Sequence, residues 1–155
     1  MEYKALPLEW VRVEPSHVVV PLDGSPLSDD AIAYALAVFD CRITVLNVVT
    51  PLDTDMSEGG ILEPDEARLD AARARADQLI ERARHQAAAS DRTVEVAVET
   101  GDPAETILAY IDTTDVDHVV IGSHGGPKIG ALRRVLGTVA TTVVGEAPVP
   151  VTVVR

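Results

Sequence analysis

The segment between residues 122 and 138 is the part of the chain best suited to bind an anion. Five of its residues are glycines, at positions 122, 125, 126, 130 and 137. Glycines have no side chains, so the backbone N–H groups beside them can approach a phosphate closely. Thr138 then begins an expected helix, whose N-terminus adds N–H donors and the positive end of a helix dipole. These residue types indicate a phosphate-binding loop.

The distribution of charge supports the same interpretation. The chain has 25 acidic residues against 13 Lys and Arg, a formal net charge of −12, yet no acid lies between residues 118 and 145. About four or five acids would be expected there at the chain's average. The same stretch contains Lys128, Arg133 and Arg134, which attract anions. The alternative is an ordinary turn, in which glycines reverse the chain and the arginines belong to a neighbouring helix.

Apolar runs alternate with helical patterns and predict the elements that position this loop. Short β-branched runs predict strands at 17–22, 42–49, 93–99, 117–121 and 150–154, and helical spacing predicts helices at 26–39, 64–90, from 103 and at 138–146. The alternation predicts a three-layer α/β/α sandwich around a five-stranded, mainly parallel, Rossmann-like sheet. Such sheets bind ligands at the carboxyl ends of their strands, near the point where the strand order reverses.

Three segments follow strand ends and are candidates for that site: residues 21–25, 47–49 and 122–138. Pro26 suits a first helical turn, so Ser25 is interpreted mainly as an N-cap, although its hydroxyl could contact a phosphate instead. His124 could hydrogen-bond a phosphate or face solvent. Asp102 is expected to cap the helix that begins at Pro103 in the same way.

Composition argues against several classes of protein. A chain this acidic repels phosphates at long range, so we expect no binding to nucleic acid or to an anionic membrane. No apolar run approaches the roughly 18–20 residues of a membrane span, and the N-terminus lacks the layout of a secretory signal. We therefore expect a cytoplasmic protein.

Cys41 is the single cysteine and is expected to be an inert apolar residue. The Asp-rich, Lys-poor composition fits a halophile, and a genome of high G+C content is the alternative explanation.

Taken in order, these segments resemble the universal stress protein family. The similarity covers about residues 17–155, so residues 1–16 are interpreted as an N-terminal extension. The matching pieces are the strand and turn 18–25, the helix with Ala31, Tyr34 and Ala35, the strand 46–49, the helix start 101–103, the strand and glycines 117–125, residues 137–139 and the tail 147–154.

The resemblance implies an adenine nucleotide alpha hydrolase-like fold that forms a homodimer through the C-terminal strand, residues 149–154. One branch of the family binds ATP, with AMP or ADP as alternatives, through the pattern G-2x-G-9x-G-(S/T). The nucleotide-binding residues that it implies here are Pro21, Leu22, Asp23, Val48, Ile121, Gly122, Gly125, Gly137, Thr138 and Val139. Ser25, His124 and Lys128 would lie near the phosphates, and Asp23 would hold Mg²⁺ that accompanies the nucleotide.

Two features depart from the family pattern. Eleven residues separate Gly125 from Gly137, where the pattern has nine, so the loop is longer by two. Asn47 stands where the family often has histidine, just before Val48, whose backbone would meet adenine. We expect a nucleotide-dependent regulator of stress survival with at most slow hydrolysis. The alternatives are a Mg²⁺-dependent ATPase with Asp23 as the metal ligand and a dimerisation module that binds no nucleotide.

Overall fold

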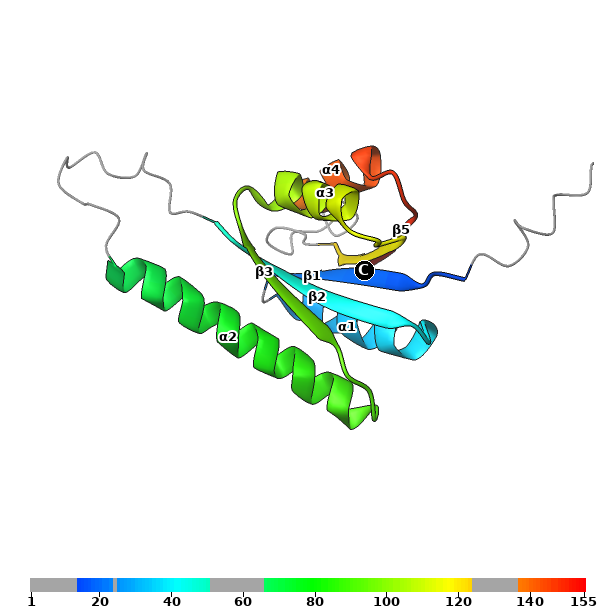
Figure 1. Cartoon of the computed structure of the whole chain (residues 1–155), viewed down its shortest axis with the longest axis horizontal. Coiled ribbons are helices and arrows are strands. Elements are labelled where there is room, and N and C mark those ends of the chain that lie inside the picture. The colour runs from blue at the N-terminus through cyan, green and yellow to red at the C-terminus, as the bar shows by residue number, and fades with distance from the viewer. Residues whose placement is uncertain (1–13, 24, 51–65, 124–136) are drawn as a thin grey trace, which may run out of the picture.

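The chain folds into alternating strands and helices around one sheet (Figure 1). The computed structural model describes residues 14–23, 25–50, 66–123 and 137–155. The elements are β1 (His17–Leu22), α1 (Pro26–Val38), β2 (Arg42–Val49), α2 (Glu66–Ala89), β3 (Glu95–Thr100), α3 (Pro103–Thr113), β4 (His118–Gly122), α4 (Thr138–Glu146) and β5 (Val151–Val154). Each predicted strand and helix is present, and the ends that lie in the described ranges differ from the predicted ones by at most two residues.

The five strands lie in the order β3-β2-β1-β4-β5, and each neighbouring pair is parallel. Helices α1 and α2 cover one face of the sheet, and α3 and α4 cover the other (Figure 1). Side chains alternate between the faces, so β1 places Val18 and Val20 against α1 and α2 and Val19 against α3 and α4. The predicted three-layer parallel fold is therefore confirmed.

The alternating sequence of β3 predicts one exposed face, but the strand is instead partly covered on both faces near its start and exposed towards its carboxyl end. Val96 packs into the core on the α1 and α2 side and Ala97 packs into the cluster under α3 and α4, whereas Val98, on the same face as Val96, is 47% exposed. The pattern differs from that of β1 and β2, which lie inside the sheet and are apolar almost throughout. A strand that is buried on both faces needs a continuous run of apolar residues, whereas a strand at the edge of the sheet does not.

Side-chain caps begin two of the helices at the predicted residues. The Ser25 hydroxyl accepts a hydrogen bond from the Ser28 N–H at 3.3 Å, and the Asp102 carboxylate accepts one from the Glu105 N–H at 3.1 Å. Both bonds satisfy N–H groups that have no partner inside the helix. None of the helices in the described ranges could span a bilayer, and α2, the longest, is charged along its length.

Candidate functional site

The order of the strands reverses between β1 and β4, and these two strands separate towards their carboxyl ends. From β1 the chain proceeds outward to β2 and β3, and it then returns to place β4 and β5 on the other side. Strand β1 pairs with β2 along its whole length, from His17 to Leu22. Its pairing with β4 covers only Val18 and Val19. Open α/β sheets bind ligands at such a reversal.

The end of β1 leads directly into the start of α1. Asp23 is exposed there, and its Oδ1 accepts a hydrogen bond from the Ser25 N–H at 2.8 Å. Ser25 in turn caps α1, so the prediction of a capping role for it is confirmed. The carboxylate and the first turn of the helix are therefore fixed together at the carboxyl edge of the sheet.

Strand β2 contributes Asn47 and Val48 to the same edge. The Asn47 side chain is 7% exposed, and its Nδ2 donates a hydrogen bond to the Leu22 carbonyl at 3.1 Å. Val48 is half-buried on the opposite face, where it packs against the cluster under α3 and α4. In the sequence, Asn47 stands out as a departure from the family pattern. It is also a lone amide within a run of apolar residues, and that pattern could have indicated a buried side chain with a structural role.

Strand β4 ends at Gly122, which lies very close to the start of α1. A Cβ at this position would lie 2.6 Å from the Leu27 carbonyl oxygen and 3.0 Å from the Leu27 Cβ. The absence of a side chain thus allows helix and strand to touch. Beyond it, the Ser123 N–H donates to the Val154 carbonyl at 2.8 Å and ties the end of β4 to the end of β5.

Helix α4 points its N-terminus at this edge. Because β4 and β5 are parallel, the connecting helix must run from the carboxyl side of the sheet back to the amino side. Its N-cap is Gly137, which has no side chain to occupy the first N–H groups. Thr138 is exposed, and Val139 packs against the same cluster as Val48. This end of α4 therefore combines backbone donors with an apolar contact.

The described residues of the predicted site lie at one edge of the sheet. They are Pro21, Leu22, Asp23, Ser25, Val48, Ile121, Gly122, Gly137, Thr138 and Val139. His124, Gly125 and Lys128 lie outside the described residues. Within the described ranges, no group of three or more His, Cys, Asp or Glu side chains could hold a metal ion. A Mg²⁺ ion at Asp23 would therefore take its other ligands from water or from a bound phosphate.

A polar network that no sequence pattern indicated occupies the opposite, amino edge of the sheet. The buried His17 ring lies 2.7 Å from Asp115 through Nδ1 and 2.7 Å from the Thr44 hydroxyl through Nε2. The bond from His17 lowers the pKa of Asp115, and the bond from Arg42 lowers the pKa of Glu95. These contacts join segments far apart in sequence, so no local pattern could reveal them.

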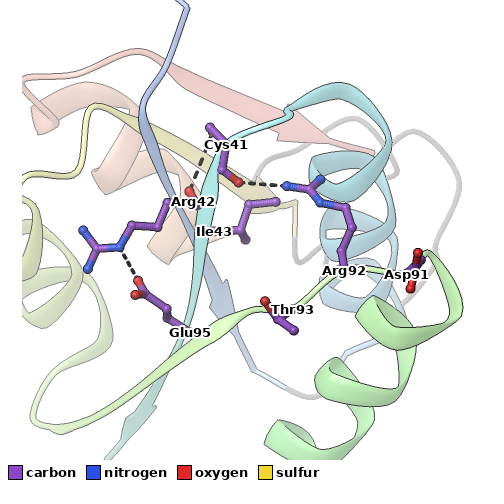
Figure 2. A pocket seen from close by; sticks show the side chains of 7 residues that line it. All are labelled: Cys41, Arg42, Ile43, Asp91, Arg92, Thr93 and Glu95. Carbon is purple, nitrogen blue, oxygen red and sulfur yellow. Dashed lines mark hydrogen bonds and ion pairs between the residues drawn. The ribbon is translucent and has the colours of Figure 1, made fainter.

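Next to this network is an open depression of about 420 Å³ (Figure 2). Its two arginines already have protein partners: Arg42 pairs with Glu95, and Arg92 donates to backbone carbonyls, including that of Cys41. Burial, followed by the charge of Asp117, raises the pKa of the Cys41 thiol. A raised pKa favours the thiol over the reactive thiolate at neutral pH. The two cationic side chains of the depression are therefore already engaged within the protein.

Comparison with known proteins gives a family and a set of similar folds. The model of the Universal stress protein family matches residues 15–155. No curated protein sequence matches the chain significantly. Among solved structures, the universal stress protein UspA from Lactobacillus plantarum superposes with a TM-score of 0.74 at 24% identity, over 93% of this chain and 100% of that one.

Two similar structures contain nucleotides. A universal stress protein in complex with cAMP has a TM-score of 0.66 at 24% identity, over 92% of this chain and 98% of that one. A universal stress protein family protein from Arabidopsis thaliana with AMP bound has a TM-score of 0.65 at 21% identity, over 90% of this chain and 91% of that one. At these identities the superpositions show the shared fold, and the ligands are those of the other proteins.

Proposed function

Because the chain belongs to the universal stress protein family, we propose that it binds an adenine nucleotide, ATP in the first instance, at the carboxyl ends of β1 and β4. The observation that carries the proposal is the separation of these two strands beyond Val19, where the strand order reverses. AMP and cAMP in two structures of the same fold support an adenine ligand.

Each part of the nucleotide has a suitable group at this edge. Val48 and Val139 pack on the same face of the sheet and are partly exposed, so they offer apolar surface to a flat base. The first N–H groups of α4, beside Gly137, suit a phosphate. Asp23 is exposed at the end of β1, where its carboxylate would help to hold Mg²⁺ with the phosphates.

The nucleotide is proposed to act as a signal rather than as a rapidly consumed substrate. Fast hydrolysis needs a general base within hydrogen-bond reach of an attacking water. The carboxylate of Asp23 already accepts the Ser25 N–H at 2.8 Å, which supports a structural role for it. ATP turnover by the purified protein is therefore expected to be slow at most. The protein would then report nucleotide level to the machinery of stress survival.

We also propose that the protein is a homodimer joined through residues 149–154. Strand β5 is the last strand of the sheet and pairs with β4 on one side only among the described residues. An edge strand leaves backbone donors and acceptors that a second strand can pair with. A two-fold axis beside β5 would place the same strand of another copy antiparallel to it.

Calorimetry of the wild-type protein and two variants of α4 tests nucleotide binding. Gly137→Val places a branched side chain where a phosphate must approach the backbone, so it should abolish binding of Mg·ATP. Gly145→Ala on the same helix is the control, because a Cβ there would meet nothing within 4 Å. It should bind as the wild type does. Absence of binding by the wild type, or equal binding by all three proteins, would contradict the proposal.

A further inference from the structure

We propose that Asn47 is a positioning residue of the nucleotide site. Its carboxamide fixes the carboxyl end of β1 and, through that end, the geometry of Asp23 and Ser25. The inference rests on the function proposed above and assigns this site a residue that makes no contact with the ligand itself.

Asn47 is buried, so its side-chain amide needs a hydrogen-bond partner within the protein. Its neighbours in β2, including Val45 and Leu46, are buried and apolar. A primary amide in such a place is unfavourable unless it is hydrogen-bonded. The Nδ2 group meets this requirement with the Leu22 carbonyl at 3.1 Å, a contact between residues 25 positions apart. The bond connects the ends of two neighbouring strands, and Leu22 is the last residue of β1.

The side chain of Asn47 lies on the face of the sheet that leads to α1. It follows Val45 by two positions, and Val45 packs in the cluster under α1 and α2, so both side chains share that face. Val48, which follows Asn47, faces α3 and α4 instead. One strand end thus supplies apolar contact for the base on one face and support for the β1–α1 connection on the other.

A second buried polar side chain holds the other end of that connection. Ser28 is 4% exposed, and its hydroxyl donates to the Ser25 carbonyl at 2.9 Å. Between these two anchors, the Ser25 N–H is bonded to Asp23. Removing the Asn47 anchor should free the β1 side of the connection while Ser28 still holds the helix side. Asp23 would then spend less time in the binding geometry, and affinity would fall accordingly.

Two substitutions remove the donor in different ways. Asn47→Leu replaces the carboxamide by an apolar group of similar size. Asn47→Asp keeps the shape of the side chain but replaces the Nδ2 donor by a carboxylate oxygen. Two hydrogen-bond acceptors, this oxygen and the Leu22 carbonyl, would then face each other. Thr44→Val is the matched control: Thr44 lies in the same strand, is 2% exposed, and bonds to His17 at the opposite edge. It should lower the melting temperature without disturbing the β1–α1 connection.

Two measurements, both well below the melting temperatures, test the assignment. Hydrogen exchange of the Ser25 amide in the nucleotide-free proteins reports the Asp23–Ser25 bond, and calorimetry with Mg·ATP reports affinity. Both Asn47 variants should speed exchange and weaken binding by at least about tenfold, whereas Thr44→Val should change neither.

Unchanged exchange and affinity in Asn47→Leu would overturn the assignment. Equal losses in Thr44→Val would overturn it as well, because the effect would then follow global stability. If the wild type bound no ATP, the proposed function would fail separately. The Ser25 exchange rates would still decide whether Asn47 fixes this connection.

Discussion

Gly122 is a single residue whose missing side chain sets the distance between a strand and a helix. The glycine is evident from the sequence, and the family resemblance explains it by contact with a nucleotide. The structure adds a steric reason, which is the contact of β4 with the Leu27 backbone. That reason could not be predicted, because the two residues are 95 positions apart and no local pattern joins them.

Gly122→Ala should therefore destabilise the protein. The new Cβ would lie 2.6 Å from the Leu27 carbonyl oxygen, and a backbone atom cannot yield as a side chain can. We expect the free energy of unfolding to fall by about 1–3 kcal/mol, the usual range for overpacking, as measured by urea denaturation. Gly145→Ala, on the exposed end of α4, should instead raise it by about 0.5–1 kcal/mol. Equal stability of Gly122→Ala and the wild type would contradict the steric account.

His118 should make stability depend on pH. Burial lowers the pKa of His118 from its ordinary value of 6.5, and Asp117 opposes this shift in part. The unfolded chain therefore takes up the proton first, and stability should fall as the pH drops below about 6.5. His118→Gln, which keeps a group able to bond to Thr152, should lose less stability between pH 7.5 and 5.5. Thermal melts across this range would check it, and equal slopes for the two proteins would refute it.

The helices show how far sequence patterns determine whole elements. N-caps and first-turn prolines are local signals, and they gave the starts of α1 and α3 correctly. The end of α2 is also local, yet it was predicted only approximately. There Asp91 adopts φ 56°, and Arg92 N–H bonds back to the Ala87 carbonyl. Glycine usually takes this left-handed position, and aspartate gives a weaker signal.

Asp91→Gly should therefore stabilise the protein. The substitution removes the strain of a side chain at positive φ and a negative charge at the C-terminal end of a helix dipole. We expect a gain of about 1 kcal/mol in the free energy of unfolding. Asp91→Ala keeps a Cβ in the same conformation and is the control, which should gain less. Chemical denaturation of both variants measures the difference, and a loss of stability in Asp91→Gly would refute the argument.

At the scale of the whole molecule, the alternation of elements predicted the layers but not where the sheet opens. Neither the order of the strands nor the short register between β1 and β4 was predicted from the sequence. Register depends on long-range packing, such as the contact of Gly122 with α1. The residues of the candidate site come from the family resemblance and stay a prediction, whereas the Asn47–Leu22 hydrogen bond joins residues 25 positions apart and is visible only in the structure.

The proposed homodimer can be tested at the edge of β5 that faces away from β4. The Pro150 and Val154 carbonyls accept bonds from β4 and from Ser123. In a parallel strand, the backbone groups of alternate residues point towards the same neighbouring strand. Pro150 and Val154 point towards β4, so the backbone N–H groups of Val151 and Val153 point away from it. Val153→Pro removes one such donor and should give monomers by light scattering. Val153→Ala loses side-chain volume but keeps the donor, so it should remain dimeric. A monomeric wild type would contradict the dimer.

The most direct test of the central claim is a titration of the isotopically labelled protein with Mg·ATP, followed by backbone amide shifts. We expect saturable shifts concentrated at Asp23, Ser25, Val48 and the first turn of α4. The depression at the opposite edge, around Arg42 and Arg92, should remain unaffected. Shifts centred on that depression, or no shifts at millimolar nucleotide, would show that the carboxyl edge between β1 and β4 is not a nucleotide site.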